Sequence, residues 1–139
     1  MISQVSIFVD NRPGSLWEVT QILGEEGINI RAVAAYDTPE FGILRMVVDQ
    51  VASAKDVLTR RGFVVRITEV VGAELVDEKG SLGRMLEALA KGGVNVNYIY
   101  SFVIRGGKAP VMVFHTDDNE KACAILGEAK IRVVEAGEL

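Results

Sequence analysis

The sequence is poor in several residue types that particular functions require. Its 139 residues include one cysteine, one histidine and three prolines, and only 6% of them are aromatic. A single cysteine forms no disulfide within the chain, which is typical of a reducing compartment. One histidine and one cysteine are too few for the usual zinc sites, so we expect no metal ion and no cofactor in a single chain.

Basic charge and long apolar runs are also lacking. Fifteen basic residues against nineteen acidic ones give a formal net charge of −4, whereas nucleic-acid-binding proteins usually carry a basic surface. No apolar segment approaches the roughly 18–20 residues that span a bilayer, and the N-terminus has no basic segment followed by a signal-peptide core. We therefore expect a cytoplasmic protein that binds neither nucleic acid nor a membrane.

What the chain does contain is an internal repeat. Gly14-Ser15-Leu16 recurs as Gly80-Ser81-Leu82, and Gly27-Ile28-Asn29-Ile30 recurs as Gly93-Val94-Asn95-Val96, both at an offset of 66 residues. Chance identities would scatter along the alignment, whereas these cluster in two short motifs. We predict two copies of one module, residues 1–70 and 71–139, although the length alone fits one ordinary domain.

Each copy shows strand and helix patterns in the same order. Strand patterns cover eight segments: 2–10, 28–37, 43–50, 63–70, 71–76, 94–104, 111–116 and 131–135. Apolar stripes at helical spacing cover four segments: 16–23, 54–58, 82–89 and 122–129. Turns are expected at 38–42 and 105–110, where proline and glycine occur. Each copy therefore runs strand, helix, strand, strand, helix, strand.

This order predicts an α+β protein of two ferredoxin-like βαββαβ modules. Right-handed crossovers give each module a four-stranded antiparallel sheet of order 4-1-3-2, with two helices on one face. We expect the modules to be paired side by side into an eight-stranded sheet, because a sheet edge exposes unpaired backbone groups. The second strands are one candidate for the pairing edges, and the sequence leaves the choice of edges open. A homodimer would cover a remaining edge. The fold by itself implies no function.

The repeated motifs resemble those of the ACT domain. The loop Asn11-x-Pro13-Gly14-Ser15-Leu16, followed by a helix that ends in Gly27-Ile28-Asn29-Ile30, is similar to the family's first loop and helix. The second copy departs from it, with Asp77 in place of the asparagine and Lys79 in place of the proline. The resemblance covers nearly the whole chain. It implies a stand-alone tandem ACT protein, a non-catalytic regulator whose ligand lies at the interface between modules.

The same residues suit an amino acid on physical grounds. A helix N-terminus offers about four unpaired N–H groups and a partial positive charge, and glycine lets a carboxylate approach the backbone closely. An asparagine carboxamide supplies a donor and an acceptor. We predict that these residues bind the ligand: Asn11, Pro13, Gly14, Ser15, Leu16, Asn29, Asp77, Gly80, Ser81, Leu82 and Asn95. Tyr36, Asp37 and Thr38 are candidates for a specificity pocket.

Structural explanations of several residues stay open. Ser15-x-x-Glu18 is a capping-box pattern, and Asn29, two residues after Gly27, is a candidate helix C-cap. Trp17 is expected to pack partly in the core. Cys123 is expected to be buried on a helix rather than paired with His115 in catalysis.

Other functions also stay open. The main alternative is a protein-interaction or regulatory subunit without a functional ligand site, acting on a separately encoded metabolic enzyme. An enzyme on the same fold, such as an acylphosphatase, is suggested by Arg12 after the first strand, but the glycine-flanked V-x-F-R pattern is missing. An RNA-recognition module is disfavoured because the third strand, 43–50, carries no aromatic residue.

Overall fold

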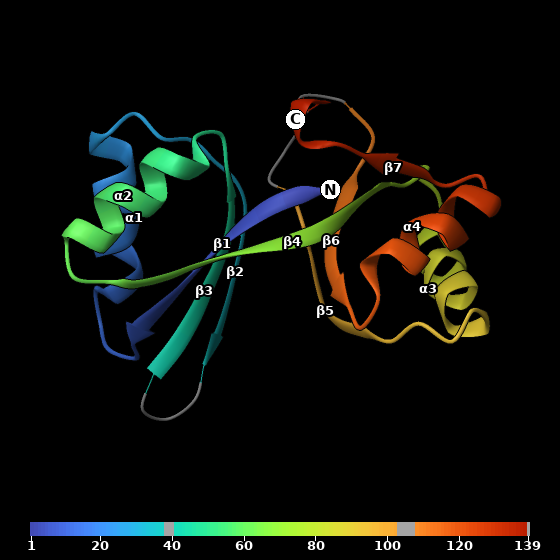
Figure 1. Cartoon of the computed structure of the whole chain (residues 1–139), viewed down its shortest axis with the longest axis horizontal. Helices are drawn as coiled ribbons and strands as arrows, with labels where there is room; N and C mark the ends of the chain where they lie inside the picture. Colours follow the sequence, from blue (N-terminus) through green and yellow to red (C-terminus); the bar gives the residue numbers. More distant parts are fainter. Residues whose placement is uncertain (38–40, 103–107, 139) are drawn as a thin grey trace. The chain divides into compact units, whose positions relative to one another are not determined.

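The computed structural model describes residues 1–37, 41–102 and 108–138. Thr38 and most of the two expected turns, at 38–42 and 105–110, lie outside this part of the chain. The described chain forms two compact units, Ser3–Thr68 and a second one made of Met1–Ile2 with Glu69–Leu139 (Figure 1). No helix in the described ranges is both long enough and apolar enough to cross a membrane.

The first unit contains the elements of one βαββαβ module. They are β1 (Ile2–Asp10), α1 (Ser15–Glu25), β2 (Ile30–Asp37), β3 (Phe41–Val48), α2 (Val51–Arg60) and the start of β4 (Val64–Glu74). The strand order is β2-β3-β1-β4. β3 is antiparallel to both neighbours, with Asp10 opposite Phe41 and Asp37 opposite Gly42. This register places the C-terminal ends of β1 and β2 close together.

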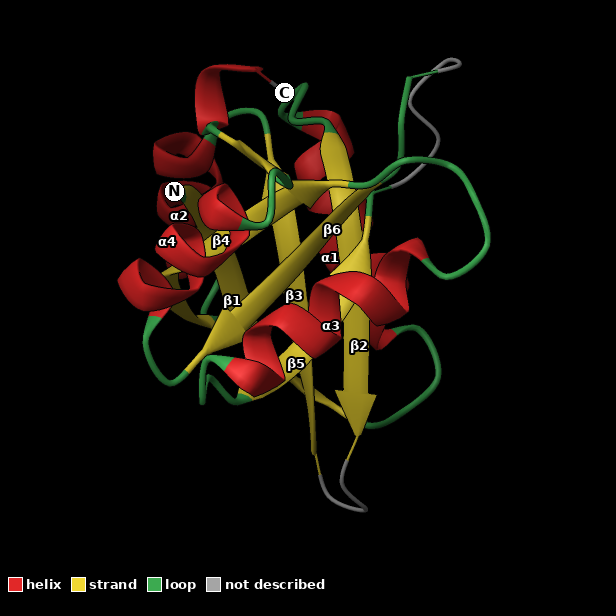
Figure 2. Cartoon of the chain, turned by 90° about the vertical axis from the view of Figure 1, so that its right-hand side faces the viewer, coloured by secondary structure: helices red, strands yellow, loops and turns green. Residues whose placement is uncertain are grey.

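The second unit repeats the arrangement. The remainder of β4 is followed by α3 (Ser81–Lys91), β5 (Val96–Ser101), β6 (Val111–Thr116), α4 (Asn119–Glu128) and β7 (Arg132–Val134). Figure 2 draws the helices in red and the strands in yellow. A 3₁₀ turn, Ala136–Glu138, ends the described chain. The strand order is β7-β4-β6-β5, and the pairs are antiparallel. Both units therefore have the order 4-1-3-2, which confirms the predicted ferredoxin-like fold.

One strand boundary was predicted wrongly. The sequence suggested separate strands at 63–70 and 71–76, but β4 runs unbroken over Val64–Glu74, so the described residues contain seven strands rather than eight. The segment holds no proline, and Gly72 lies within it with the side chain of Ile2 packed closely over its Cα. With no turn residue between two β-branched runs, the chain continues as one strand.

Each unit has its own apolar core between its helices and its strands. In the first, the buried stripe of α1 is Val19, Ile22 and Leu23, and the stripe of α2 is Ala54, Val57 and Leu58. In the second, Met85 and Leu89 of α3 meet Ala122 and Leu126 of α4, with Phe114 of β6 fully buried among them. Full burial of such a side chain contributes about 1.5–3 kcal/mol.

Two expectations for α1 are corrected by this core. Leu16 was placed in the buried stripe and Trp17 partly in the core, but their exposed fractions are 45% and 67%. The reason is the helix start: Ser15 is the first helical residue and takes the buried position one turn before Val19, so its two successors turn outward. Both apolar side chains thus stand at the surface beside the preceding loop.

Candidate functional site

The loops before α1 and α3 have nearly the same backbone. Gly14 (φ 86°, ψ −6°) and Gly80 (φ 87°, ψ −4°) are left-handed and cap the two helices. An L-residue there costs about 1–2 kcal/mol, which explains why glycine recurs. No side chain caps either helix. The capping-box interpretation of Ser15 is therefore wrong, because Ser15 is the first residue inside the helix.

A cavity of about 340 Å³ opens beside the loop of the first copy. Its walls are the end of β1 with the loop, the first turn of α1, and the adjoining ends of β2 and β3. Three predicted ligand residues (Asn11, Ser15 and Leu16) line it, together with Tyr36 and Asp37, which we expected to form a specificity pocket. The volume lies in the range of sites for small molecules.

Ser15 supplies an unusual polar group at this cavity. Its exposed fraction is 6%, and its hydroxyl has no hydrogen-bond partner in the structure. Most buried polar side-chain atoms are paired, and an unpaired one costs about 1–3 kcal/mol. Ser15 lines the cavity as a residue while its unpartnered hydroxyl is covered, so a change of its χ1 rotamer would bring this hydroxyl to a ligand in the cavity.

Charged groups of both signs surround the same cavity. The guanidinium of Arg12 lies 3.7 Å from Asp10 Oδ2 and 3.7 Å from Glu18 Oε2. Both distances exceed a normal hydrogen bond, so the guanidinium can turn toward another carboxylate. Asp37, at the end of β2, adds a further carboxylate to the wall. This arrangement suits a small zwitterion, with its carboxylate near Arg12 and its ammonium group near Asp10 or Asp37.

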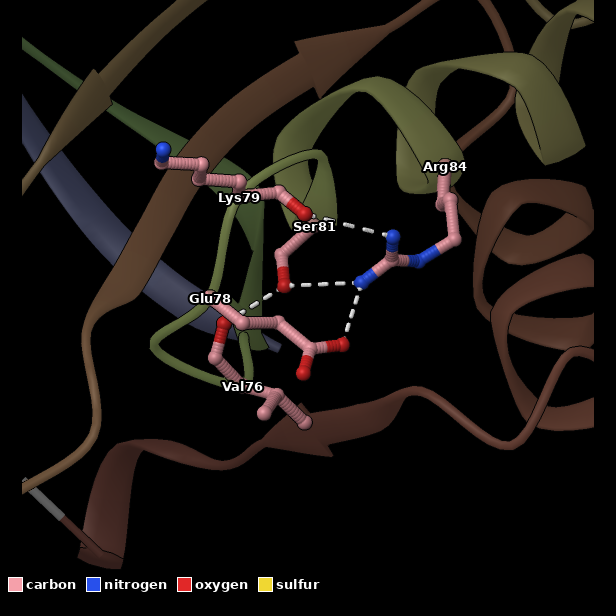
Figure 3. Close-up of polar contacts among 5 residues, drawn as sticks. All are labelled: Val76, Glu78, Lys79, Ser81 and Arg84. Atoms are coloured by element: carbon pink, nitrogen blue, oxygen red, sulfur yellow. Dashed lines mark hydrogen bonds and ion pairs between the residues drawn. The ribbon is translucent and has the colours of Figure 1, made fainter.

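The loop of the second copy is internally bonded (Figure 3). Ser81 Oγ donates to the carbonyl of Val76 at 2.5 Å and accepts from Arg84 Nη2 at 3.2 Å. Arg84 Nη2 also donates to Glu78 Oε1 at 2.6 Å, and Nη1 donates to the carbonyl of Lys79 at 3.4 Å. Thus Ser81 has partners within its own loop, whereas Ser15 has none.

The remaining predicted residues occupy other places. Pro13 is exposed beside Gly14, and Asp77 and Leu82 are exposed around Gly80. Asn29 and Asn95 lie before β2 and β5, where their backbone N–H groups donate to Asp49 Oδ1 at 2.9 Å and to Asp117 Oδ1 at 3.0 Å. In the first copy, Ile30 pairs with Val48 at one end of β3, and Asp10, next to the loop, pairs with Phe41 at the other end. Asn29 therefore lies at the end of the sheet opposite the loop of its own copy. The C-cap of α1 is Glu26, not Asn29.

Asp10, Arg12 and Arg84 are charged residues at the two loops that are missing from the predicted ligand-binding residues. Arg12 and Glu18 stand 66 residues before Glu78 and Arg84, so the repeat carries one ion pair with its charges exchanged. The repeat is visible in its identical residues, whereas these four positions differ between the copies. A search for compensating charges at the repeat offset would have found them.

A catalytic pair of Cys123 and His115 receives no support from their surroundings. His115 stacks on Tyr98 at 5.4 Å between ring centroids, and its Nδ1 lies 2.8 Å from Asn97 Nδ2. Cys123 is half-buried on α4 and packs against the second core. No group of three or more potential metal ligands occurs among the described residues.

We expect Cys123 to react slowly with thiol reagents. Burial raises the pKa of its thiol, so the neutral form persists to a higher pH than in an unfolded chain. The reaction with 5,5′-dithiobis(2-nitrobenzoic acid) at pH 8 should therefore be slower in the native protein than in urea, because the thiolate is the form that reacts. Equal rates in the two states would show an exposed, ionised thiol.

Comparisons with known proteins agree with this fold. A family model for the ACT domain pair matches residues 1–139. A protein of solved structure from Bacteroides thetaiotaomicron is 33% identical, with a TM-score of 0.90 over 99% of this chain and 94% of that one. The regulatory subunit of aspartate kinase from Thermus thermophilus, in its ligand-free form, is 18% identical, with a TM-score of 0.65 over 91% of each chain.

The corresponding subunit from Thermus flavus is 17% identical, with a TM-score of 0.62 over 92% of each chain. At these identities the two aspartate kinase subunits show a common fold. Among curated proteins, no sequence matches this chain. The family model covers every residue and the fold has the same two modules, so the chain belongs to the family of ACT domain pairs.

Proposed function

We propose that this ACT domain pair is a non-catalytic regulatory protein that binds an amino acid at the loop of its first copy. The observation that carries the proposal is a cavity of about 340 Å³ lined by Ser15, whose buried hydroxyl lacks a protein partner. The cavity also has a guanidinium and carboxylates on its walls, from Arg12, Asp10 and Asp37. An amino acid presents the charges and hydrogen-bonding groups that complement this set.

The bound pose follows from these groups. The α-carboxylate of the ligand accepts hydrogen bonds from Arg12, from the Ser15 hydroxyl and from the N-terminus of α1, where the helix dipole favours negative charge. The α-ammonium group donates to Asp10 or Asp37. The ligand's side chain contacts Leu16 and Tyr36, whose exposed fractions of 45% and 38% leave apolar surface to be covered.

One observation favours a second role, contact with another protein chain. Trp17 is 67% exposed directly after the ligand loop, and large aromatic side chains are enriched at protein interfaces. We propose that this surface contacts a second copy or a separately encoded enzyme, and that ligand binding at the loop alters the contact. Because Trp17 is the single tryptophan of the sequence, its fluorescence also reports binding at this loop.

A thermal-shift measurement with each of the twenty amino acids tests the proposed function. An amino acid that binds only the folded protein, at 100 times its Kd, stabilises it by about 2.7 kcal/mol. For a chain of this size that corresponds to a rise in Tm of about 5–10 °C. No shift with any of the twenty would count against an amino-acid ligand.

Two serine variants then locate the ligand. Ser15→Ala removes a hydroxyl that has no protein partner, so we expect little loss of stability but about 3–10-fold weaker binding, corresponding to one hydrogen bond. The matched control is Ser81→Ala, which removes the bond to Val76 and leaves binding unchanged. If Ser81→Ala weakens binding and Ser15→Ala does not, the ligand is at the other loop.

A further inference from the structure

The two loops carry the same ion pair with opposite polarity. In the first copy the cation, Arg12, is on the loop and the anion, Glu18, is on the first turn of α1. In the second copy the anion, Glu78, is on the loop and the cation, Arg84, is on the first turn of α3. The φ and ψ angles of Gly14 and Gly80 agree to within a few degrees, but the charges beside them are exchanged. The two loops therefore have the same backbone and different chemistry.

In the second copy a cavity of about 270 Å³ also adjoins the loop, and the exchanged pair of Glu78 and Arg84 on its wall is bonded within the loop. The guanidinium of Arg84 reaches back over the glycine, and its Nη1 is 3.0 Å from the point where a Cβ on Gly80 would lie. It bonds the carboxylate of Glu78 at 2.6 Å, the hydroxyl of Ser81 and the carbonyl of Lys79 (Figure 3). The loop thus already holds a carboxylate, supplied by Glu78, against a guanidinium.

In the first copy the corresponding groups are only loosely held. The Arg12–Glu18 contact is 3.7 Å, against 2.6 Å for Glu78–Arg84. The Ser15 hydroxyl has no partner, whereas Ser81 has two. A carboxylate from outside therefore gains hydrogen bonds at the first loop, whereas at the second it would displace bonds that the protein already makes.

We propose that the two loops have different functions: the first receives the ligand's carboxylate, whereas at the second the guanidinium of Arg84 is already occupied by Glu78, which takes the place of a ligand although a cavity adjoins that loop. The chain then binds one amino acid rather than two. This inference rests on the proposed function for the first loop. The polarity of the pair, with the cation on the loop in one copy and the anion on the loop in the other, decides which loop accepts a carboxylate from outside.

Exchanging the charges tests this directly. In Glu78→Arg/Arg84→Glu the second loop acquires the polarity of the first, and in Arg12→Glu/Glu18→Arg the first acquires the polarity of the second. The control is Glu87→Lys/Lys91→Glu, which exchanges a pair with a separation of 2.7 Å in the C-terminal half of α3. All three double variants keep the net charge, and these half-exposed pairs contribute little to stability.

The readout is the amide NMR spectrum of the ¹⁵N-labelled protein, titrated with an equimolar mixture of the twenty amino acids. In the wild type and the control we expect shifts at Gly14–Leu16 and none at Gly80–Leu82. The second-loop exchange should add shifts at Gly80–Leu82, and the first-loop exchange should remove those at Gly14–Leu16. Shifts at both loops of the wild type would overturn the inference while leaving the proposed function standing.

Hydrogen exchange tests, without any ligand, whether the bonds of Arg84 hold the second loop in place. Arg84→Met removes the guanidinium but keeps a long helix-forming side chain, so we expect amide exchange in the 77–82 segment to rise at least about fivefold, the equivalent of about 1 kcal/mol. The matched control is Lys91→Met, with no change in that segment. Unchanged exchange in Arg84→Met would show that Arg84 does not hold the loop. Absence of titration shifts at Gly14 would instead refute the proposed function itself.

Discussion

Replacing Phe114 with alanine is expected to lower the free energy of unfolding by about 3–5 kcal/mol. Phe114 is among the largest fully buried side chains and belongs to the core formed with α3 and α4. It stands on β6 between Val71 of β4 and Ile99 of β5, so both neighbouring strands lose a packing partner. Stabilities of about 5–15 kcal/mol are usual for a domain, so this single change removes a large share.

Urea titration followed by far-UV circular dichroism measures the effect. With an m-value of about 2 kcal/mol/M, the midpoint should fall by roughly 1.5–2.5 M. The urea midpoint of Phe114→Leu should lie between those of the wild type and Phe114→Ala. The leucine variant therefore still tests the prediction if the alanine variant is unfolded. The control is Phe8→Ala, since Phe8 is 39% exposed and should lose about 1 kcal/mol or less. Equal losses for Phe8 and Phe114 would contradict the assigned core.

The fold was predictable because the repeat shows the sequence pattern of each helix and strand twice. Gly14 and Gly80 share one backbone conformation, and Gly27 and Gly93 both have a positive φ, 69° and 74°. A glycine that recurs at the same offset indicates a backbone requirement rather than chance. The alternation of β-branched residues and the helical stripes then determine the order of elements, and right-handed crossovers determine the order of strands.

The continuous strand β4 was not predictable in the same way. A boundary was placed after Val70 because two modules were expected to have two separate strands there, and nothing in the local pattern marks a break. Similarly, Leu16 matches the apolar period of its helix. It is only the second residue of α1, however, and its side chain lies beside the preceding loop and is 45% exposed. Periodicity predicts which face of a helix is apolar, but it does not predict whether the core also buries that face in the first and last turns.

The candidate site was predictable at the level of the loop but not of its side-chain bonding. Glycine and serine at equivalent positions suggested two equivalent sites. The difference between them comes from the unpaired hydroxyl of Ser15 and the three bonds of Arg84, which depend on rotamers and on contacts a few residues away. Residue identity at one position carries no such information. The exchanged charges at the repeat offset indicate that the loops differ, and the atomic contacts show how.

Replacing Arg12 with methionine is expected to weaken amino-acid binding by about 10–100-fold. A charge-assisted hydrogen bond contributes about 1.5–3 kcal/mol, and its loss at a half-exposed position lies toward the lower end of that range. The free protein should change little, since the contacts of Arg12 with Asp10 and Glu18 are both 3.7 Å and half-exposed. The expected pattern is therefore lost affinity at nearly constant stability.

Fluorescence of Trp17, titrated with the amino acid that gives the largest thermal shift, measures the affinity. Arg60→Met is the matched control, because Arg60 pairs with Asp56 at 3.0 Å on the exposed face of α2 and does not line the cavity. Arg12→Lys keeps the charge but loses the planar pair of donors, so its affinity for the amino acid should lie between those of Arg12→Met and Arg60→Met. If Arg12→Met bound as tightly as Arg60→Met, the carboxylate would be held by the helix N-terminus and Ser15 without the guanidinium. The charge exchange between the two loops would then have no bearing on which one binds.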